Sequence, residues 1–295
     1  MNKEEITQLK QAGKIASQLV EYAKSIIKKD MPLLEIANLI DDKILSLKAK
    51  SAFPVNLSIN EIAAHSTPSY NDEAKAHGLL KVDIGVHIDG NVADTAFSLD
   101  LEDSDENKSL IKAAEESLKA AIKKINLNTP LRQIGEAIES TCKSHNVTPI
   151  HNLSGHSISQ YQIHSGITIP NFDNNQETPI TEGVYAIEPF TTFGHGSVKE
   201  GKLSGIYHLE KQGNVRDSFA RQVLQYIKEE FQTLPFSARQ IHRKFSTRGL
   251  LALRQIESAG LLHHYPQLIE KSGSKVAQAE HTILITEDEK IVTTQ

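Results

Sequence analysis

The chain has 295 residues, and its 37 acidic and 32 basic side chains give a formal net charge of −5, which argues against nucleic acid as an obligatory partner. No apolar run reaches about 18 residues, so a membrane span is not expected. The single cysteine, Cys142, has no partner for an internal disulfide, and the amino-terminal sequence lacks the features of a signal or transit peptide, which indicates the reducing cytoplasm.

The first two predicted elements are amphipathic helices. Apolar side chains recur every three or four positions over residues 4–28, which predicts a helix with one buried face. A second helix is predicted to begin after Asp30, which would cap it, with Pro32 near its first turn, and to run to Leu47. Residues 51–60 are typical of a strand and a loop.

A β-hairpin is predicted next. Strand-type residues flank Asp89 and Gly90, and this dipeptide favours the positive φ angles of a tight two-residue turn. Beyond the hairpin, residues 104–124 form a long amphipathic pattern, and a further helix begins near residues 128–130.

The order of two helices followed by strands therefore occurs twice. Four residues recur at a shift of 98 positions (from 32 to 130): Pro32, Leu33, Ile36 and Ile40 match Pro130, Leu131, Ile134 and Ile138. This predicts an α+β fold in which two related halves pack their strands into one sheet with the helices on one side. Chance similarity between amphipathic helices is the alternative.

The third part of the chain differs in pattern. The glycine-rich residues 194–205 are interpreted as a strand connection, because they lack the spacing of a dinucleotide-binding loop. Helices are predicted over residues 216–230, 237–245 and 247–259, and a closing hairpin over 281–295. Basic residues in this helical part could indicate nucleic acid, but the glutamates among them favour a solvated face.

Two aspartates in the predicted hairpin need an explanation. Asp83 and Asp94 occupy strand positions, where aspartate is uncommon and costly to bury without a partner. A turn at Asp89 and Gly90 places Asp94 opposite Gly85 and diagonal to Asp83 on the same face, and the absent side chain of Gly85 would leave room for an ion. The alternative is that both aspartates lie at an edge and point to water.

Further acidic residues extend this pattern, and so do three histidines: His65, His156 and His164. Glu188 and Glu280 each lie in an apolar, strand-like context, and four such carboxylates would repel one another without neutralising cations. Carboxylate and imidazole ligands suit a pair of divalent metals. Nine histidines are assigned to ordinary surface or core positions: His77, His87, His145, His151, His195, His208, His242, His263 and His264.

Together these segments resemble the methionine aminopeptidases of the type II group, in the short form without an amino-terminal extension. Five motifs occur in the order of that family: FPVNLSINEIAAHSTP, KVDIGVHIDGNVADTAFSLD, NLSGHSISQYQIH, AIEPF and QAEHTIL. The resemblance implies the "pita-bread" fold, with two pseudo-twofold-related halves sharing one curved antiparallel sheet. It also implies a catalytic domain of residues 1–195 and 270–295, and a small, mainly helical, winged-helix-like insertion at 196–269.

The resemblance also implies a site for two divalent ions, with cobalt, manganese, iron, zinc and nickel as candidates. It assigns five metal ligands: Asp83, Asp94, His156, Glu188 and Glu280. Asp94 and Glu280 are expected to bridge the ions, while His65 and His164 are expected to act as catalytic histidines near the scissile amide, with Glu188 as proton shuttle. The methionine pocket is expected to comprise Phe53, His65, Ile163, His164, Phe190 and Tyr265.

The implied reaction is removal of the amino-terminal methionine from nascent proteins and peptides, with a small second residue preferred. The chain is expected to be a cytoplasmic monomer that works near the ribosome, with no obligatory nucleic acid partner and no membrane partner. Two alternatives share the fold: a proline-specific aminopeptidase or prolidase, and a non-catalytic binding protein.

Overall fold

The computed structural model describes residues 1–295 and contains six helices and sixteen strands. The helices are α1 (Lys3–Ile26), α2 (Leu33–Ser46), α3 (Asp105–Lys124), α4 (Leu131–Ser144), α5 (Ser218–Glu230) and α6 (Ala238–Ser258). None of them combines the length and the apolar character that crossing a lipid bilayer would require.

All strand pairs are antiparallel. Strands of the first half are β1 (Lys50–Ser51), β2 (Asn56–Ile59), β3 (Ile62–Ala64), β4 (Leu79–Ile88) and β5 (Asn91–Asp100). Those of the second half are β6 (Thr148–Pro149), β7 (Ser154–Ile158), β8 (Thr168–Pro170), β9 (Gly183–Ile187), β10 (Phe190–Thr192), β14 (Val276–Gln278), β15 (His281–Ile285) and β16 (Lys290–Val292). Between them lie β11 (Val198–Leu209), β12 (Phe236–Ser237) and β13 (Leu262–Glu270).

The predicted hairpin is confirmed with its register. β4 pairs with β5 around a turn at Asp89 and Gly90, and Asp94 lies opposite Gly85 as expected. The alternate residues of β4, including Val82 and Ile84, belong to the apolar cluster that packs against α1 and α2. Because side chains alternate along a strand, the aspartates lie on the face that points away from those helices.

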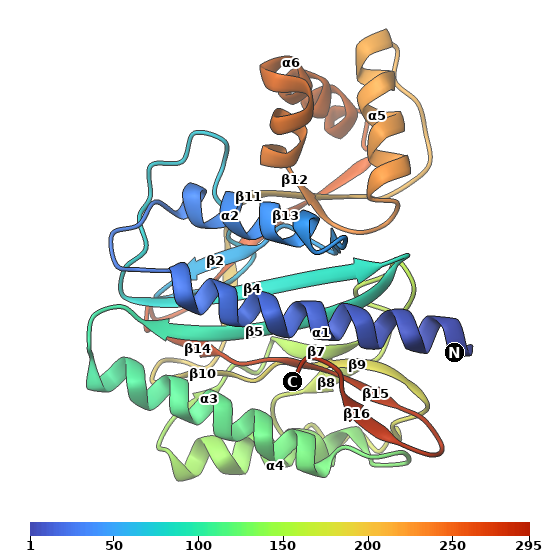
Figure 1. Cartoon of the computed structure of the whole chain (residues 1–295). Helices are drawn as coiled ribbons and strands as arrows, with labels where there is room; N and C mark the ends of the chain where they lie inside the picture. The colour runs from blue at the N-terminus through green and yellow to red at the C-terminus, as the bar shows by residue number, and fades with distance from the viewer.

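The two halves meet along β5. The backbone N–H of Glu280 donates to the carbonyl of Ala96, and the hydroxyl of Thr282 exchanges hydrogen bonds with the backbone of Asp94. These contacts join the strands of the first half to β15 and so produce the curved antiparallel sheet. α1 runs along β4 and β5, while α3 and α4 cover the strands of the second half (Figure 1).

The repeat is also visible in the backbone that leads into each second helix. Asp30 and Asn128 both have left-handed φ angles, of 65° and 66°, and Pro32 and Pro130 occupy the two N-cap positions. The prediction that Asp30 caps the second helix is therefore wrong. Asp and Asn tolerate a left-handed conformation better than most residues, so Asp30 forms the turn before the helix instead of capping it.

The interpretation of residues 194–205 as a strand connection is wrong for most of their length. Residues 198–209 form β11, which pairs with β13 over a long ribbon that contains two register shifts. α5 and α6 pack on this ribbon through a separate apolar cluster that contains only residues between 207 and 262. The two helices lie at the top of the molecule in this view, and α6 reaches α2 through the ion pair of Arg239 and Asp41 (Figure 1).

Candidate active site

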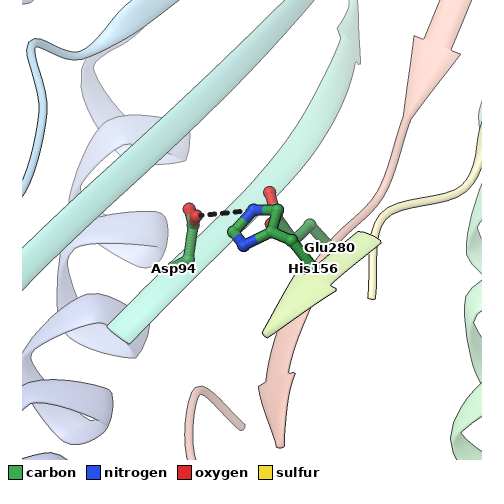
Figure 2. A group of neighbouring side chains, drawn as sticks. All are labelled: Asp94, His156 and Glu280. Atoms are coloured by element: carbon green, nitrogen blue, oxygen red, sulfur yellow. Dashed lines mark ion pairs between the residues drawn. The ribbon is translucent and has the colours of Figure 1, made fainter. Parts of the chain in front are cut away.

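The site begins with carboxylates and a histidine from both halves of the sheet. Asp94 comes from β5, His156 from β7, and Glu280 directly precedes β15. One potential ligand atom from each of the three lies within 4.8 Å of the other two. His156 Nε2 lies 3.8 Å from Asp94 Oδ2, and Figure 2 shows this pair with Glu280 beside the imidazole ring.

Two further carboxylates complete the cluster. Glu188, which follows β9, places Oε1 at 3.6 Å from His156 Nε2. Asp83 of β4 lies close enough to Asp94 to raise the pKa of that carboxyl by repulsion, as its diagonal position on the hairpin allows. The alternative that the two aspartates point to water is wrong, because Asp94 is only 3% exposed and Oδ1 of Asp83 is buried. All five predicted ligands therefore line one cavity.

Burial dominates the electrostatics of the cluster. It raises the pKa of Asp94, Glu188 and Glu280 well above the ordinary range, and repulsion from the neighbouring carboxylates raises these pKa values further. Burial also raises the pKa of Asp83 to about 7 and lowers the pKa of His156 to about 3. Without cations, the site would therefore hold protonated carboxyl groups beside a neutral imidazole.

The cluster fits divalent cations. Asp83 Oδ1 and Asp94 Oδ1 are buried oxygens that no protein group hydrogen-bonds, and such oxygens are costly unless a cation or proton satisfies them. The side-chain amide that hydrogen-bonds the carboxylates is that of Gln278, whose Nε2 lies 3.4 Å from Glu188 Oε2 and 3.5 Å from Glu280 Oε2. The residues Asp94, His156 and Glu280 could hold a metal ion, with Asp83 and Glu188 adjacent.

The two predicted catalytic histidines lie beside this cluster. The ring of His164 lies 4.4 Å from that of His156, centroid to centroid. His65 follows β3 with a left-handed φ of 58° and contacts Tyr265 edge-on at 5.2 Å. Burial lowers the pKa of His65 to about 4 and also lowers the pKa of His164, so both rings are neutral at pH 7.

Most of the predicted pocket residues line the same cavity. Phe53, Ile163 and Tyr265 contribute its apolar wall, next to both histidines and all five candidate ligands. Phe190 is not among the residues that line it, so its place in the pocket stays a prediction. Its side chain is 1% exposed and packs in an apolar cluster with Ile150 and Val276.

The space above Gly85 is also different from the expectation. A side-chain carbon on Gly85 would lie 2.1 Å from Cε1 of Phe53, so an aromatic ring fills the position that the sequence suggested for an ion. The glycine thus makes room for the wall of the pocket. The carboxylates lie beside this wall, where β7 and the residues that flank β9 and β15 supply the remaining candidate ligands.

Several residues of the cavity had not been predicted. Asn56, Ala64, Ile206 and Pro235 line it. Gln278 shares a strand face with Glu280, so the period of two along this segment could have indicated it. His208, which had been assigned to ordinary positions, is half-buried with its ring 5.2 Å from that of Tyr265. His195 is exposed and hydrogen-bonds Ser197.

Comparisons with known proteins show which family and fold this chain resembles. The model of metallopeptidase family M24 matches residues 7–287. The chain is 42% identical over 288 residues to the methionine aminopeptidase of Methanocaldococcus jannaschii, with 97% of each chain covered. It is 35% identical over 312 residues to methionine aminopeptidase 2 of Candida dubliniensis, covering 97% of this chain and 68% of that protein. The solved structure of a thermophilic Arx1 has a TM-score of 0.86 at 14% identity, over 99% of this chain and 91% of that chain, a likeness of fold alone.

Proposed function

This chain belongs to metallopeptidase family M24, and we propose that its buried centre removes methionine from the amino terminus of proteins and peptides. It is a metallo-exopeptidase that hydrolyses the first peptide bond. The observation that carries this function is a single cavity in which carboxylates and a histidine adjoin two neutral histidines and an apolar wall. Relatives aligned over nearly the whole chain carry the same activity in their names.

The residues that would hold two divalent ions are Asp83, Asp94, His156, Glu188 and Glu280. Asp94 and Glu280, which lie in the middle of the cluster, would serve both ions. Divalent ions bound there would supply Lewis acidity and bring the pKa of a water molecule toward neutrality. Cobalt, manganese, iron, zinc and nickel all accept these ligand types.

The remaining side chains would position the substrate and move its protons. His164, neutral at pH 7, would donate its N–H to the carbonyl oxygen that gains negative charge. His65 would hold the nitrogen of the scissile amide, and Glu188 would carry a proton to the leaving amine. Phe53, Ile163 and Tyr265 would enclose the methionine side chain, whose thioether makes favourable contacts with aromatic rings. A small second residue is preferred for steric reasons.

The finer family assignment is type II. Its support is the insertion at residues 196–269, which has its own apolar cluster, and the relative named methionine aminopeptidase 2. The catalytic domain would comprise residues 1–195 and 270–295. Of the first two histidines that follow Glu188 along the chain, His208 would extend the methionine pocket, because its ring contacts Tyr265 whereas His195 is exposed.

The substrates would be the amino termini of nascent chains near the ribosome, reached by a monomer in the cytoplasm. A free buried thiol at Cys142 is compatible with a reducing compartment.

Methionine release from a Met-Ala-Ser peptide tests the function. Metal-stripped protein would receive manganese, iron, cobalt, zinc or nickel, with a Glu188→Ala variant and an Ala-Pro-Ser peptide as controls. We expect metal-dependent release of methionine that the variant loses. Cleavage of only the Ala-Pro bond would reassign the chain to the proline-specific enzymes, and no cleavage with any metal would indicate a binding protein.

A further inference from the structure

A buried arginine links the helical insertion to the segment that carries His65. Arg239 is the second residue of α6 and is 4% exposed. Arginine is rarely buried without a partner, and a cation in the first turn of a helix is unfavourable beside the positive end of the helix dipole. The position of Arg239 therefore needs an explanation outside the insertion itself.

Its guanidinium group contacts two elements of the first half. Nη2 donates to Asp41 Oδ2 of α2 at 3.0 Å. Nη1 donates to the hydroxyl of Thr67 at 3.0 Å and to the carbonyl of Pro68 at 2.9 Å. Asp41 thus orients the guanidinium, and the opposite edge of the group holds the residues that directly follow His65.

Thr67 connects Arg239 to the wall of the pocket by a second hydrogen bond. Its hydroxyl donates to the carbonyl of Val55 at 2.9 Å, and the backbone N–H of Leu57 donates to the carbonyl of Ser66 at 2.6 Å. Val55 lies between Phe53 and Asn56, both of which line the cavity. The segment 65–68 is therefore fastened to the segment 53–57, and each contributes side chains to the site.

The backbone conformation of His65 depends on these contacts. Its left-handed φ of 58° is a conformation that non-glycine residues keep only where the surroundings determine it. On one side of His65, Ala64 pairs with Leu268 of β13; on the other, the side-chain amide of Gln267 donates to the hydroxyl of Ser66 at 3.0 Å. The insertion thus contacts the chain on both sides of this histidine.

We propose that Arg239 is a positioning residue for His65, through which the helical insertion holds the 65–68 segment in its catalytic conformation. This inference rests on the proposed function, in which His65 contacts the scissile amide. Arg239 itself does not line the cavity and acts only through Thr67 and Pro68.

Substitutions at Thr67 test the link without breaking the buried ion pair. Thr67→Val removes the hydroxyl that joins Arg239 to Val55 and keeps the shape of the side chain, whereas Thr67→Ser keeps the hydroxyl. Arg239→Lys keeps the charge but loses the planar guanidinium, whose two Nη atoms donate to different partners. Arg243→Gln is the matched control, because Arg243 lies one turn farther along α6 and pairs with Asp42 at the surface.

Three quantities would be measured on each folded variant: kcat and KM for Met-Ala-Ser, manganese affinity, and backbone hydrogen exchange over residues 65–70. We expect Thr67→Val and Arg239→Lys to lower kcat about ten- to a hundredfold, the range for a slightly misplaced catalytic group. KM and manganese affinity should change less, and exchange over residues 65–70 should become faster. Thr67→Ser and Arg243→Gln should match the wild type.

Wild-type kcat and wild-type exchange in both Thr67→Val and Arg239→Lys would overturn the proposal, and so would an equal loss of kcat in Arg243→Gln. A loss of thermal stability alone, with kcat unchanged below the unfolding transition, would mean that the link is merely structural and would also overturn it. If the wild type releases no methionine with any metal, the proposed function fails, and unchanged exchange in the variants would then overturn the link separately.

Discussion

Asp94 and Glu280 show at the scale of single residues why this site must hold either protons or cations. Both side chains are almost fully buried, at 3% and 1% exposure, and each lies beside other carboxylates. Ionising them together in a place that excludes water would be costly, so the protein must hold protons or cations there. Metal binding and proton release are therefore coupled in this site.

The first prediction concerns pH and the metal-free protein. Burial in the folded state raises the pKa of Asp94 and Glu280 well above the ordinary range and the pKa of Asp83 to about 7. In the unfolded chain, the same carboxyl groups ionise at pH ~4. Between these values the folded state binds more protons, so the free energy of unfolding should fall as pH rises, by about 1.4 kcal/mol per pH unit for each such proton. Urea denaturation of chelator-treated protein between pH 5 and 8 measures this.

Glu280→Gln is the control for that titration. It removes one buried carboxyl and should make the pH profile shallower, and saturating manganese should flatten the wild-type profile because the cation replaces the protons. A free energy of unfolding that stays level or rises over this range in the metal-free wild type would contradict the pKa assignments.

The second residue-scale prediction concerns His164. Replacing it with alanine removes a neutral donor beside the carboxylate cluster, and loss of one oxyanion donor lowers kcat about 10²- to 10³-fold. KM should change much less, because the contact forms only as the carbonyl oxygen gains charge. Steady-state kinetics on Met-Ala-Ser would measure both, with His77→Ala as the control at an exposed histidine. An unchanged kcat would exclude His164 from this role.

At the scale of elements, the parts that follow from local sequence were predictable. The Asp89-Gly90 turn determines its hairpin locally, so the register that brings Asp94 opposite Gly85 could be read before the fold was known. β11 could not be read in this way. Gly201 and Gly205 disfavour a strand locally, and β11 is extended because it pairs with β13, more than fifty residues later along the chain.

The direction of a side chain beyond its own strand was not predictable either. Phe53 and Phe190 both adjoin family motifs, but only Phe53 is among the residues that line the cavity, whereas Phe190 packs in an apolar cluster with Val276 of β14. The same limit applies to the link between Arg239 and Thr67, since these residues are 172 positions apart.

The third prediction tests how the hairpin and the pocket wall fit together. Gly85→Ala would place a methyl group 2.1 Å from the original position of Phe53 Cε1 and so push this ring into the cavity. KM for Met-Ala-Ser should rise about tenfold or more, as expected from the loss of about 1.4 kcal/mol of binding in an altered apolar pocket. Manganese affinity should change less than KM, because the atoms nearest the new methyl group belong to Phe53 and not to a carboxylate.

A double-mutant cycle provides the control for Gly85→Ala. Phe53→Leu shortens the ring that the new methyl group meets, so the double variant should recover part of the lost affinity relative to Gly85→Ala alone. Additive losses in the double variant would show that the two residues do not compete for the same space.

At the scale of the whole molecule, the cluster lies where the two halves meet. Asp83 and Asp94 come from the first half, whereas His156, Glu188 and Glu280 come from the second. The complete set of ligands for a cation therefore forms only while the two halves are packed together. Metal binding should therefore stabilise the two halves as one unit, and the insertion, with its separate apolar cluster, less strongly.

The sole cysteine offers a reporter of this coupling. Cys142 is fully buried in α4, and burial raises the pKa of its thiol to about 11, so thiol reagents should label it only when the second half opens. Ile44 occupies the equivalent position of α2 in the first half, at the same shift of 98 positions (from 44 to 142), and is also buried. Ile44→Cys combined with Cys142→Ser therefore gives a matched reporter for the first half.

With manganese at 100 times its Kd, labelling of both reporters should slow about 100-fold, since a ligand at that concentration stabilises the folded state by about 2.7 kcal/mol. A third reporter, Val223→Cys in the Cys142→Ser background, lies in the core of the insertion and should slow much less, because that cluster can open while the ligands stay in place. Labelling of Cys142 that slows while the reporter at position 44 does not would mean that the first half opens without releasing the metal. Asp83 and Asp94 would then contribute little to holding the ions. Equal slowing of the reporters at positions 142 and 44 would instead mean that the cations stabilise the contact between the halves in addition to their role in the chemistry.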